Sequence, residues 1–183
     1  LGKAKEMYLQ SLEIRKALAE ETKMIEARRN LSVSYNKLGD IYESEGKLEE
    51  AKEMYLKGFE ISKAIAEETK TIESRRDLFV SYNKLGNIYK AEGKLEEAKE
   101  MYLQGLGISN FLAEEARMVD TRRNLSVSYE KLGDIYEIEG KIQKAKGMYL
   151  KGLEISKAIA EETKTIESCR DLSISYNKLG DIC

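Results

Sequence analysis

The sequence contains no proline, no histidine and no tryptophan in 183 residues. Because proline breaks helix interiors, its absence favours long helices with few rigid turns. The absence of histidine removes the side chain most used for acid–base chemistry near neutral pH and for zinc or copper ligation. We therefore expect neither a metal site nor a cofactor.

Neither sign of charge is in clear excess, since 31 Lys and Arg residues nearly balance 33 Asp and Glu residues, for a net charge of −2. Nucleic-acid binding relies on a basic excess, so we expect no nucleic-acid partner. No apolar run approaches the roughly 18 residues that span a bilayer, and the first residues do not resemble a signal peptide. These features predict a soluble, cytoplasmic protein without a membrane partner.

The sequence shows no pattern typical of an enzyme. It has no GxSxG, no P-loop, no HExxH and no acidic calcium loop. Paired glutamates such as Glu49-Glu50 alternate with lysines on predicted helix surfaces, where such charges are usually solvated and paired with each other. The two cysteines, Cys169 and Cys183, do not form a CxxC pair. We predict no catalytic residue and a non-enzymatic protein.

What the sequence does contain is a repeat of 47 residues. The segment RRNLSVSYNKLGDIYESEG begins at Arg28, and close copies begin at Arg75, Arg122 and Cys169. All 11 tyrosines fall on three positions of this period. The chain is thus predicted to be a single array over 1–183, made of a half repeat (1–27), three full repeats (28–74, 75–121 and 122–168) and a truncated repeat (169–183).

Each repeat has the pattern of two helices. Leu31, Tyr35, Leu38 and Tyr42 are spaced by four, three and four residues, which places them on one helix face. Gly46 is suited to end this first helix, and the second helix is expected to begin near Leu48. The return to the next first helix, over 67–71, has a threonine as N-cap candidate but no strong stop signal. The matching residues 116–118 lack even the threonine.

These residues resemble the tetratricopeptide repeat family at eight positions of the first full repeat: Tyr35, Leu38, Gly39, Tyr42, Gly46, Ala51, Tyr55 and Gly58. The usual period is about 34 residues, and Lys63 replaces the proline that normally closes the second helix, so this helix can continue through Ile65. The sequence is thus similar to the longer repeats of kinesin light chain. The resemblance implies an all-α, right-handed superhelical solenoid of eight helices in antiparallel pairs, each of roughly 18–22 residues.

The resemblance also implies a non-catalytic scaffold that binds a peptide or a protein partner in a concave groove lined by the first helices. An asparagine amide can both donate to and accept from a peptide backbone, whatever the peptide's side chains. Glu130, Asp134 and Glu137 should make the third full repeat prefer basic ligand residues. The predicted groove residues are Arg29, Asn36, Asp40, Arg76, Asn83, Asn87, Arg123, Glu130, Asp134, Arg170, Asn177 and Asp181, beside Val33, Val80, Val127 and Ile174.

Two alternatives remain open at this point. Asn36 and Asp40 are four residues apart and could simply bond to each other along the helix, which would leave a merely polar surface. The chain also begins with a second helix and ends within a first helix, and neither end has a polar capping helix. We therefore expect either a piece of a longer array or a structural module whose ends assemble into a head-to-tail homo-oligomer.

Overall fold

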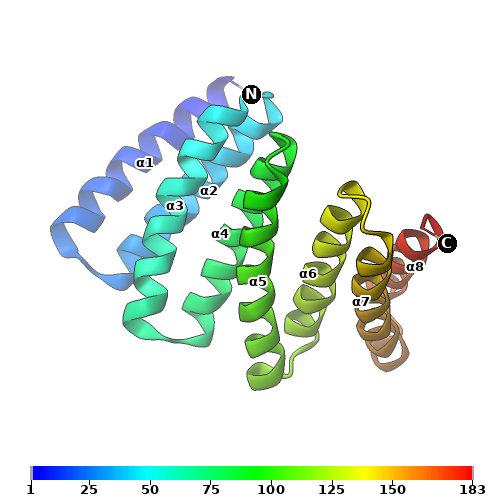
Figure 1. Cartoon of the computed structure of the whole chain (residues 1–183). Helices are drawn as coiled ribbons and strands as arrows, with labels where there is room; N and C mark the ends of the chain where they lie inside the picture. The colour runs from blue at the N-terminus through cyan, green and yellow to red at the C-terminus, as the bar shows by residue number, and fades with distance from the viewer. Residues whose placement is uncertain (1, 183) are drawn as a thin grey trace. The chain divides into compact units, whose positions relative to one another are not determined.

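The structure is a computed structural model that describes the backbone of residues 2–182 and the side chains of residues 5–182. This part of the chain contains eight α-helices and no β-strand (Figure 1). Leu1, Cys183 and the side chain of Ala4, which were assigned to repeat positions, lie outside the described residues. The predicted all-α repeat fold is confirmed.

The chain divides into two compact units, which we call the N-terminal unit (Leu1–Lys94) and the C-terminal unit (Leu95–Cys183). Even-numbered helices are the first helices of the repeats, and odd-numbered helices are the second helices. The N-terminal unit contains α1 (Gly2–Thr22), α2 (Ile25–Ser44), α3 (Leu48–Thr69) and α4 (Ile72–Ala91), and the C-terminal unit contains α5 (Leu95–Ala116), α6 (Val119–Ile138), α7 (Ile142–Thr163) and α8 (Ile166–Gly180).

Seven of the eight helix lengths agree with the prediction of roughly 18–22 residues, and α8 is shorter. Helices α1–α7 have 20 to 22 residues, and α8 has 15. The second helix of the first full repeat runs past Lys63 to Thr69, so Ile65 lies inside it and is buried. Without a proline at this position the second helix gains the extra turns that the longer period requires.

The turn from each first helix to its second helix depends on one glycine. Gly46, Gly93 and Gly140 have φ angles of 74°, 74° and 71°, in the left-handed region that glycine enters without strain. The backbone N–H of Lys47 then donates to the carbonyl oxygen of Tyr42 at 2.9 Å, which closes the end of α2. The second helix begins at Leu48, as predicted.

The return from second to first helix uses a lysine in place of a glycine. Lys70 and Lys164 adopt left-handed φ angles of 54° and 52° and end α3 and α7. Thr71 then caps α4, because its hydroxyl accepts a hydrogen bond from the backbone N–H of Ser74 at 3.1 Å. The predicted threonine N-cap is confirmed, and the first helices begin three residues before the repeat boundaries drawn from the sequence. Met118 starts α6 without a side-chain cap.

Small residues bring the two helices of each pair into close contact. A Cβ atom on Gly39 would lie 2.5 Å and 2.6 Å from two ring carbons of Tyr55, so the ring occupies space that only a glycine leaves free. Gly133 and Tyr149 make the same contact in the C-terminal unit. On the second helix, Gly58 makes room for Asn36 in the corresponding way, which agrees with its predicted role as a point of close approach.

The apolar core of the N-terminal unit lies around α2. Leu31 and Leu38 form a buried cluster with Leu12 of α1, and Met54 and Ile61 of α3 pack against it. Each first helix packs one side on a second helix of its own unit and has a remaining face on which Val33, Val80, Val127 and Ile174 are exposed. We call this remaining face the first-helix face.

Candidate functional site

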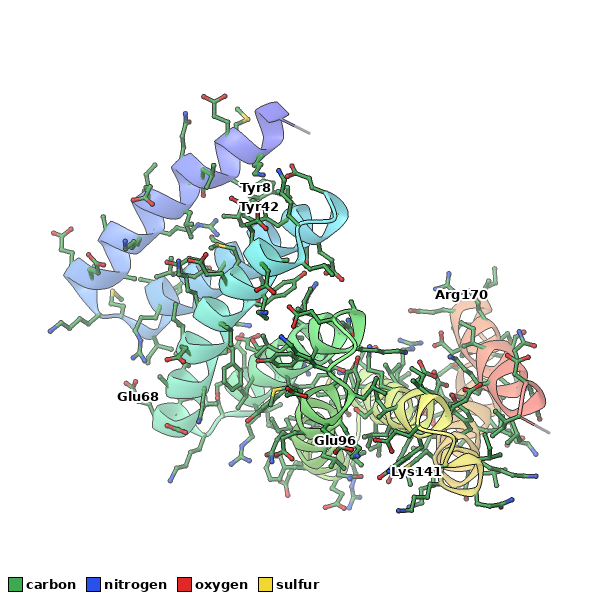
Figure 2. The ribbon with its side chains drawn as sticks, turned by 45° about the horizontal axis from the view of Figure 1, so that its top comes forward. Tyr8, Tyr42, Glu68, Glu96, Lys141 and Arg170 are labelled. Carbon is green, nitrogen blue, oxygen red and sulfur yellow. The ribbon has the colours of Figure 1, made fainter. Side chains whose placement is uncertain are left out.

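Two of the four predicted arginines on the first-helix face bind the next first helix of their own unit. The Nε of Arg29 on α2 donates to Asp77 of α4 at 2.5 Å, and its guanidinium also pairs with Glu73. In the C-terminal unit the Nε of Arg123 donates to Asp171 at 2.7 Å. Arg76 is half-buried on α4, and Arg170 is exposed on α8 (Figure 2). Arg29 and Arg123 therefore connect neighbouring first helices.

The predicted aspartates hold the buried tyrosines. The Tyr55 hydroxyl lies 2.6 Å from Oδ1 of Asp40 and 2.7 Å from Oε2 of Glu43. Burial, reinforced by both carboxylates, raises the pKa of the Tyr55 hydroxyl, which therefore keeps its proton and remains a donor. Lys84 of α4 pairs with Asp40 and balances its charge.

The C-terminal unit repeats this cluster with equivalent residues. The Tyr149 hydroxyl lies 2.9 Å from Asp134 and 2.6 Å from Glu137, and Lys178 pairs with Asp134 at 2.7 Å. Asp134 and Glu137 were expected to attract basic ligand residues. In the structure both accept hydrogen bonds from Tyr149, whereas Glu130 accepts one from Ser175 of α8.

The predicted asparagines differ in burial and in hydrogen bonding. Asn36 is half-buried, and its Oδ1, which lies over Gly58, has no hydrogen-bond partner among the described residues. The side chain of Asn83 donates to the carbonyl oxygen of Phe79 at 2.9 Å. Asn177 is exposed and Asn87 is half-buried. Asn36 and Asp40 do not bond to each other, and Asp40 accepts from Tyr55 and Lys84.

Apolar side chains are also exposed on the first-helix face. Val33, Val80, Val127 and Ile174 are 37–42% exposed at one repeat position. Asp181 is also exposed, in the turn just after α8. Each unit thus presents a pair of exposed β-branched side chains between fixed ion pairs.

Each unit contains a partly enclosed cavity next to its arginine–aspartate pair, and the cavity of the C-terminal unit is also lined by the row. In the C-terminal unit it has a volume of about 90 Å³ and is lined by residues of α6, α7 and α8, among them Arg123, Val127, Glu130, Ile159, Asp171 and Ile174. In the N-terminal unit a cavity of about 140 Å³ is lined by the equivalent Arg29, Ile65, Ser74 and Asp77. Glu130 lines the first cavity, whereas Asn36 does not line the second.

A buried serine network was missed at the sequence level. The Ser32 and Ser62 hydroxyls lie 2.7 Å apart, and Ser62 lies 3.2 Å from Ser81 of the next first helix. In the C-terminal unit Ser156 likewise lies between Ser126 and Ser175, at 2.8 Å and 3.1 Å. Recurrence of serine at the same repeat positions was the available signal, because buried hydroxyls need partners.

Two further classes of site are absent from the described residues. None of these helices is both long and apolar enough to cross a membrane. Within the same part of the chain, no cysteine and carboxylate side chains gather in a group that could hold a metal ion.

Comparison with known families gives three matches at the period of the repeat. Residues 33–65, 80–111 and 127–159 match the tetratricopeptide repeat model, and together they make up more than half of the chain. The chain belongs to the tetratricopeptide repeat family. Proteins of this family typically act as non-catalytic scaffolds for protein–protein interaction.

Solved tetratricopeptide structures share the fold. BtubC (BKLC) from P. vanneervenii is 21% identical with a TM-score of 0.72, over 99% of this chain and 65% of that one. A putative kinesin light chain of Podosopora anserina with nearly identical TPR-like repeats is 22% identical with a TM-score of 0.61, over 98% of this chain and 79% of that one. A variant of the same Podosopora anserina protein gives 21% identity and a TM-score of 0.64 over the same shares.

The chain therefore spans just under two thirds of the length of BtubC. None of the curated proteins compared with the chain matches its sequence significantly. The resemblance of this tetratricopeptide array to elongated, kinesin-light-chain-like repeats is confirmed at the level of the fold.

The environment of Asn36 generates a prediction about stability. Asn36→Ala should stabilise the protein by about 1 kcal/mol more than Asn30→Ala, because only the first change removes a buried oxygen without a partner. Asn30 is exposed on the same helix, so its replacement changes helix propensity alone. Urea unfolding followed by circular dichroism measures both. Equal gains would mean that the Asn36 amide costs nothing in the folded protein.

Proposed function

We propose that the chain is a protein-binding scaffold whose first-helix faces take an extended peptide or an extended segment of a partner protein. The exposed apolar row, made of Val33 and Val80 in the N-terminal unit and Val127 and Ile174 in the C-terminal unit, carries this proposal. Exposed apolar patches often mark interaction surfaces. The one substitution in the row, valine to Ile174, keeps an apolar β-branched side chain. By contrast, the position three residues later changes from asparagine to Glu130 in the third full repeat.

The ion pairs beside the row support the same proposal. Arg29 and Arg123 are fixed by carboxylates of the next first helix, so a ligand would meet a rigid surface. A rigid surface loses little side-chain entropy when a partner binds, which favours affinity. The exposed Arg170, Asn177 and Asp181 on and after α8 would add polar contacts at the rim.

The proposal is tested by selecting ligands from a displayed library of random short peptides and measuring their affinities by fluorescence anisotropy. The double variant Val33→Glu with Val127→Glu should weaken the selected peptides about tenfold or more, since a charge would be desolvated in the contact. The matched control is Leu56→Glu with Leu150→Glu, which changes comparably exposed side chains of the second helices α3 and α7.

The control should leave affinity nearly unchanged. If the control weakens binding more than the test variant, the ligand binds the second helices and the proposal is wrong. Failure to select any peptide above an unrelated control protein would also contradict it.

A second function is favoured by the exposed faces of α1 and α8. Met7 and Ile14 of α1 are 65% and 70% exposed, whereas Met54 and Ile61, at the same repeat positions of α3, pack against α2. On α8, Tyr176 is 51% exposed, whereas the equivalent Tyr129 is half-buried. Inside the array, the equivalent face of a second helix is covered by the preceding first helix. A second copy of this chain could therefore dock its first helix α8 on α1.

Sedimentation equilibrium over a range of concentrations tests this head-to-tail assembly. Wild type should associate, and Ile14→Glu should abolish association because it places a charge in the contact. Leu150→Glu, which lies outside that contact, should associate like wild type. A wild-type chain that stays monomeric at the highest concentration, or equal behaviour of the two variants, would rule out assembly through α1.

A further inference from the structure

The third full repeat carries a charge at a first-helix position that is neutral in the other repeats. Glu130 on α6 stands where the other first helices have Asn36, Asn83 and Asn177. Its side chain lies over Gly152, and its Oε1 accepts a hydrogen bond from the buried Ser175 hydroxyl of α8 at 2.6 Å. The carboxylate is therefore held in a defined place between α6, α7 and α8.

No Lys or Arg side chain of the described residues forms a salt bridge with Glu130. Arg123 lines the same cavity, but its Nε donates to Asp171 at 2.7 Å. Lys178 is paired with Asp134 at 2.7 Å. Burial raises the pKa of the Glu130 carboxyl, Asp134 and Asp171 add to the rise, and Ser175 and Lys178 only partly oppose it. A cation supplied by a ligand would stabilise the buried carboxylate and so offset the free-energy cost of its desolvation.

The walls of the cavity suit a ligand that is apolar along its length and charged at its end. Val127, Ile159 and Ile174 provide apolar lining, and Glu130 and Asp171 provide carboxylate oxygens. Lysine and arginine side chains bury their methylene stems against apolar surface and direct the charged end to a carboxylate. Val127 and Ile174 also belong to the exposed apolar row, so a peptide lying on that row would pass the mouth of the cavity.

We propose that the cavity between α6, α7 and α8 receives a basic side chain of the bound partner, with Glu130 as its counter-charge. This specificity rests on the peptide-binding function proposed above. The equivalent cavity of the N-terminal unit has no counterpart of Glu130, because Asn36 lies outside its lining. Its two carboxylates, Glu73 and Asp77, are both paired with Arg29. The array therefore selects a basic residue at one place along the ligand.

The test is an NMR titration of the ¹⁵N-labelled chain with N-acetyl-arginine-methylamide and N-acetyl-lysine-methylamide. The neutral control probe is N-acetyl-citrulline-methylamide, which keeps the shape of arginine without its charge. Saturable shifts are expected for amides of α6 and α8 with at least one basic probe. Citrulline should bind about tenfold more weakly or not at all.

Glu130→Asn, which installs the residue of the other repeats, should weaken the basic probe about tenfold. The matched control is Glu154→Asn, which removes one negative charge from an exposed site on α7 and should leave the affinity unchanged. Equal binding of citrulline, equal effects of the two variants, or no saturable shift with either basic probe would overturn the proposal.

The experiments can disprove the basic-residue site and the peptide-binding function independently of each other. If library peptides bind but gain no affinity from a basic residue and ignore Glu130→Asn, the scaffold function stands and the basic-residue site is wrong. If the basic probes bind through Glu130 but no peptide is selected, the cation site stands and peptide binding on the apolar row is wrong.

Discussion

The contact between a tyrosine ring and a glycine backbone fixes the geometry of the repeat. The Tyr55 ring fills the space beside Gly39, so α2 and α3 pack at a separation that no larger residue would allow. At the far end of the ring, the hydroxyl reaches Asp40 and Glu43 of α2. Lys84 of α4 then binds Asp40, so the same contact continues into the next first helix.

This constraint decides which polar residues are left for a ligand. Asp40 and Glu43 accept hydrogen bonds from the Tyr55 hydroxyl, and Arg29 is paired with Asp77. Much of the polar surface that the family resemblance would assign to a ligand therefore maintains the spacing of the helices. The side chains outside these contacts include the exposed β-branched row and the exposed Arg170 and Asn177 of α8. Glu130, which accepts from Ser175, adds a charge in the C-terminal unit.

The sequence predicted those features that depend on contacts within a few residues. The glycine turn at Gly46, the start at Leu48 and the cap at Thr71 each have a local signal, and all three are found. The helix end at Lys70 could not be predicted, because a lysine in the left-handed conformation has no local signal in the sequence. The partner of Arg29 could not be predicted either, since Asp77 lies a full repeat away in the sequence.

The central claim is that the glycine under each tyrosine ring is required by the ring, and two glycines of the C-terminal unit test it directly. Gly133 lies against Tyr149, whereas a Cβ on Gly147 of α7 would meet nothing within 4 Å. In urea unfolding, Gly133→Ala should cost about 2–3 kcal/mol through overpacking, and Gly147→Ala should gain about 1 kcal/mol through helix propensity. If Gly133→Ala is as stable as Gly147→Ala, the contact does not set the packing of the repeat and the account is wrong.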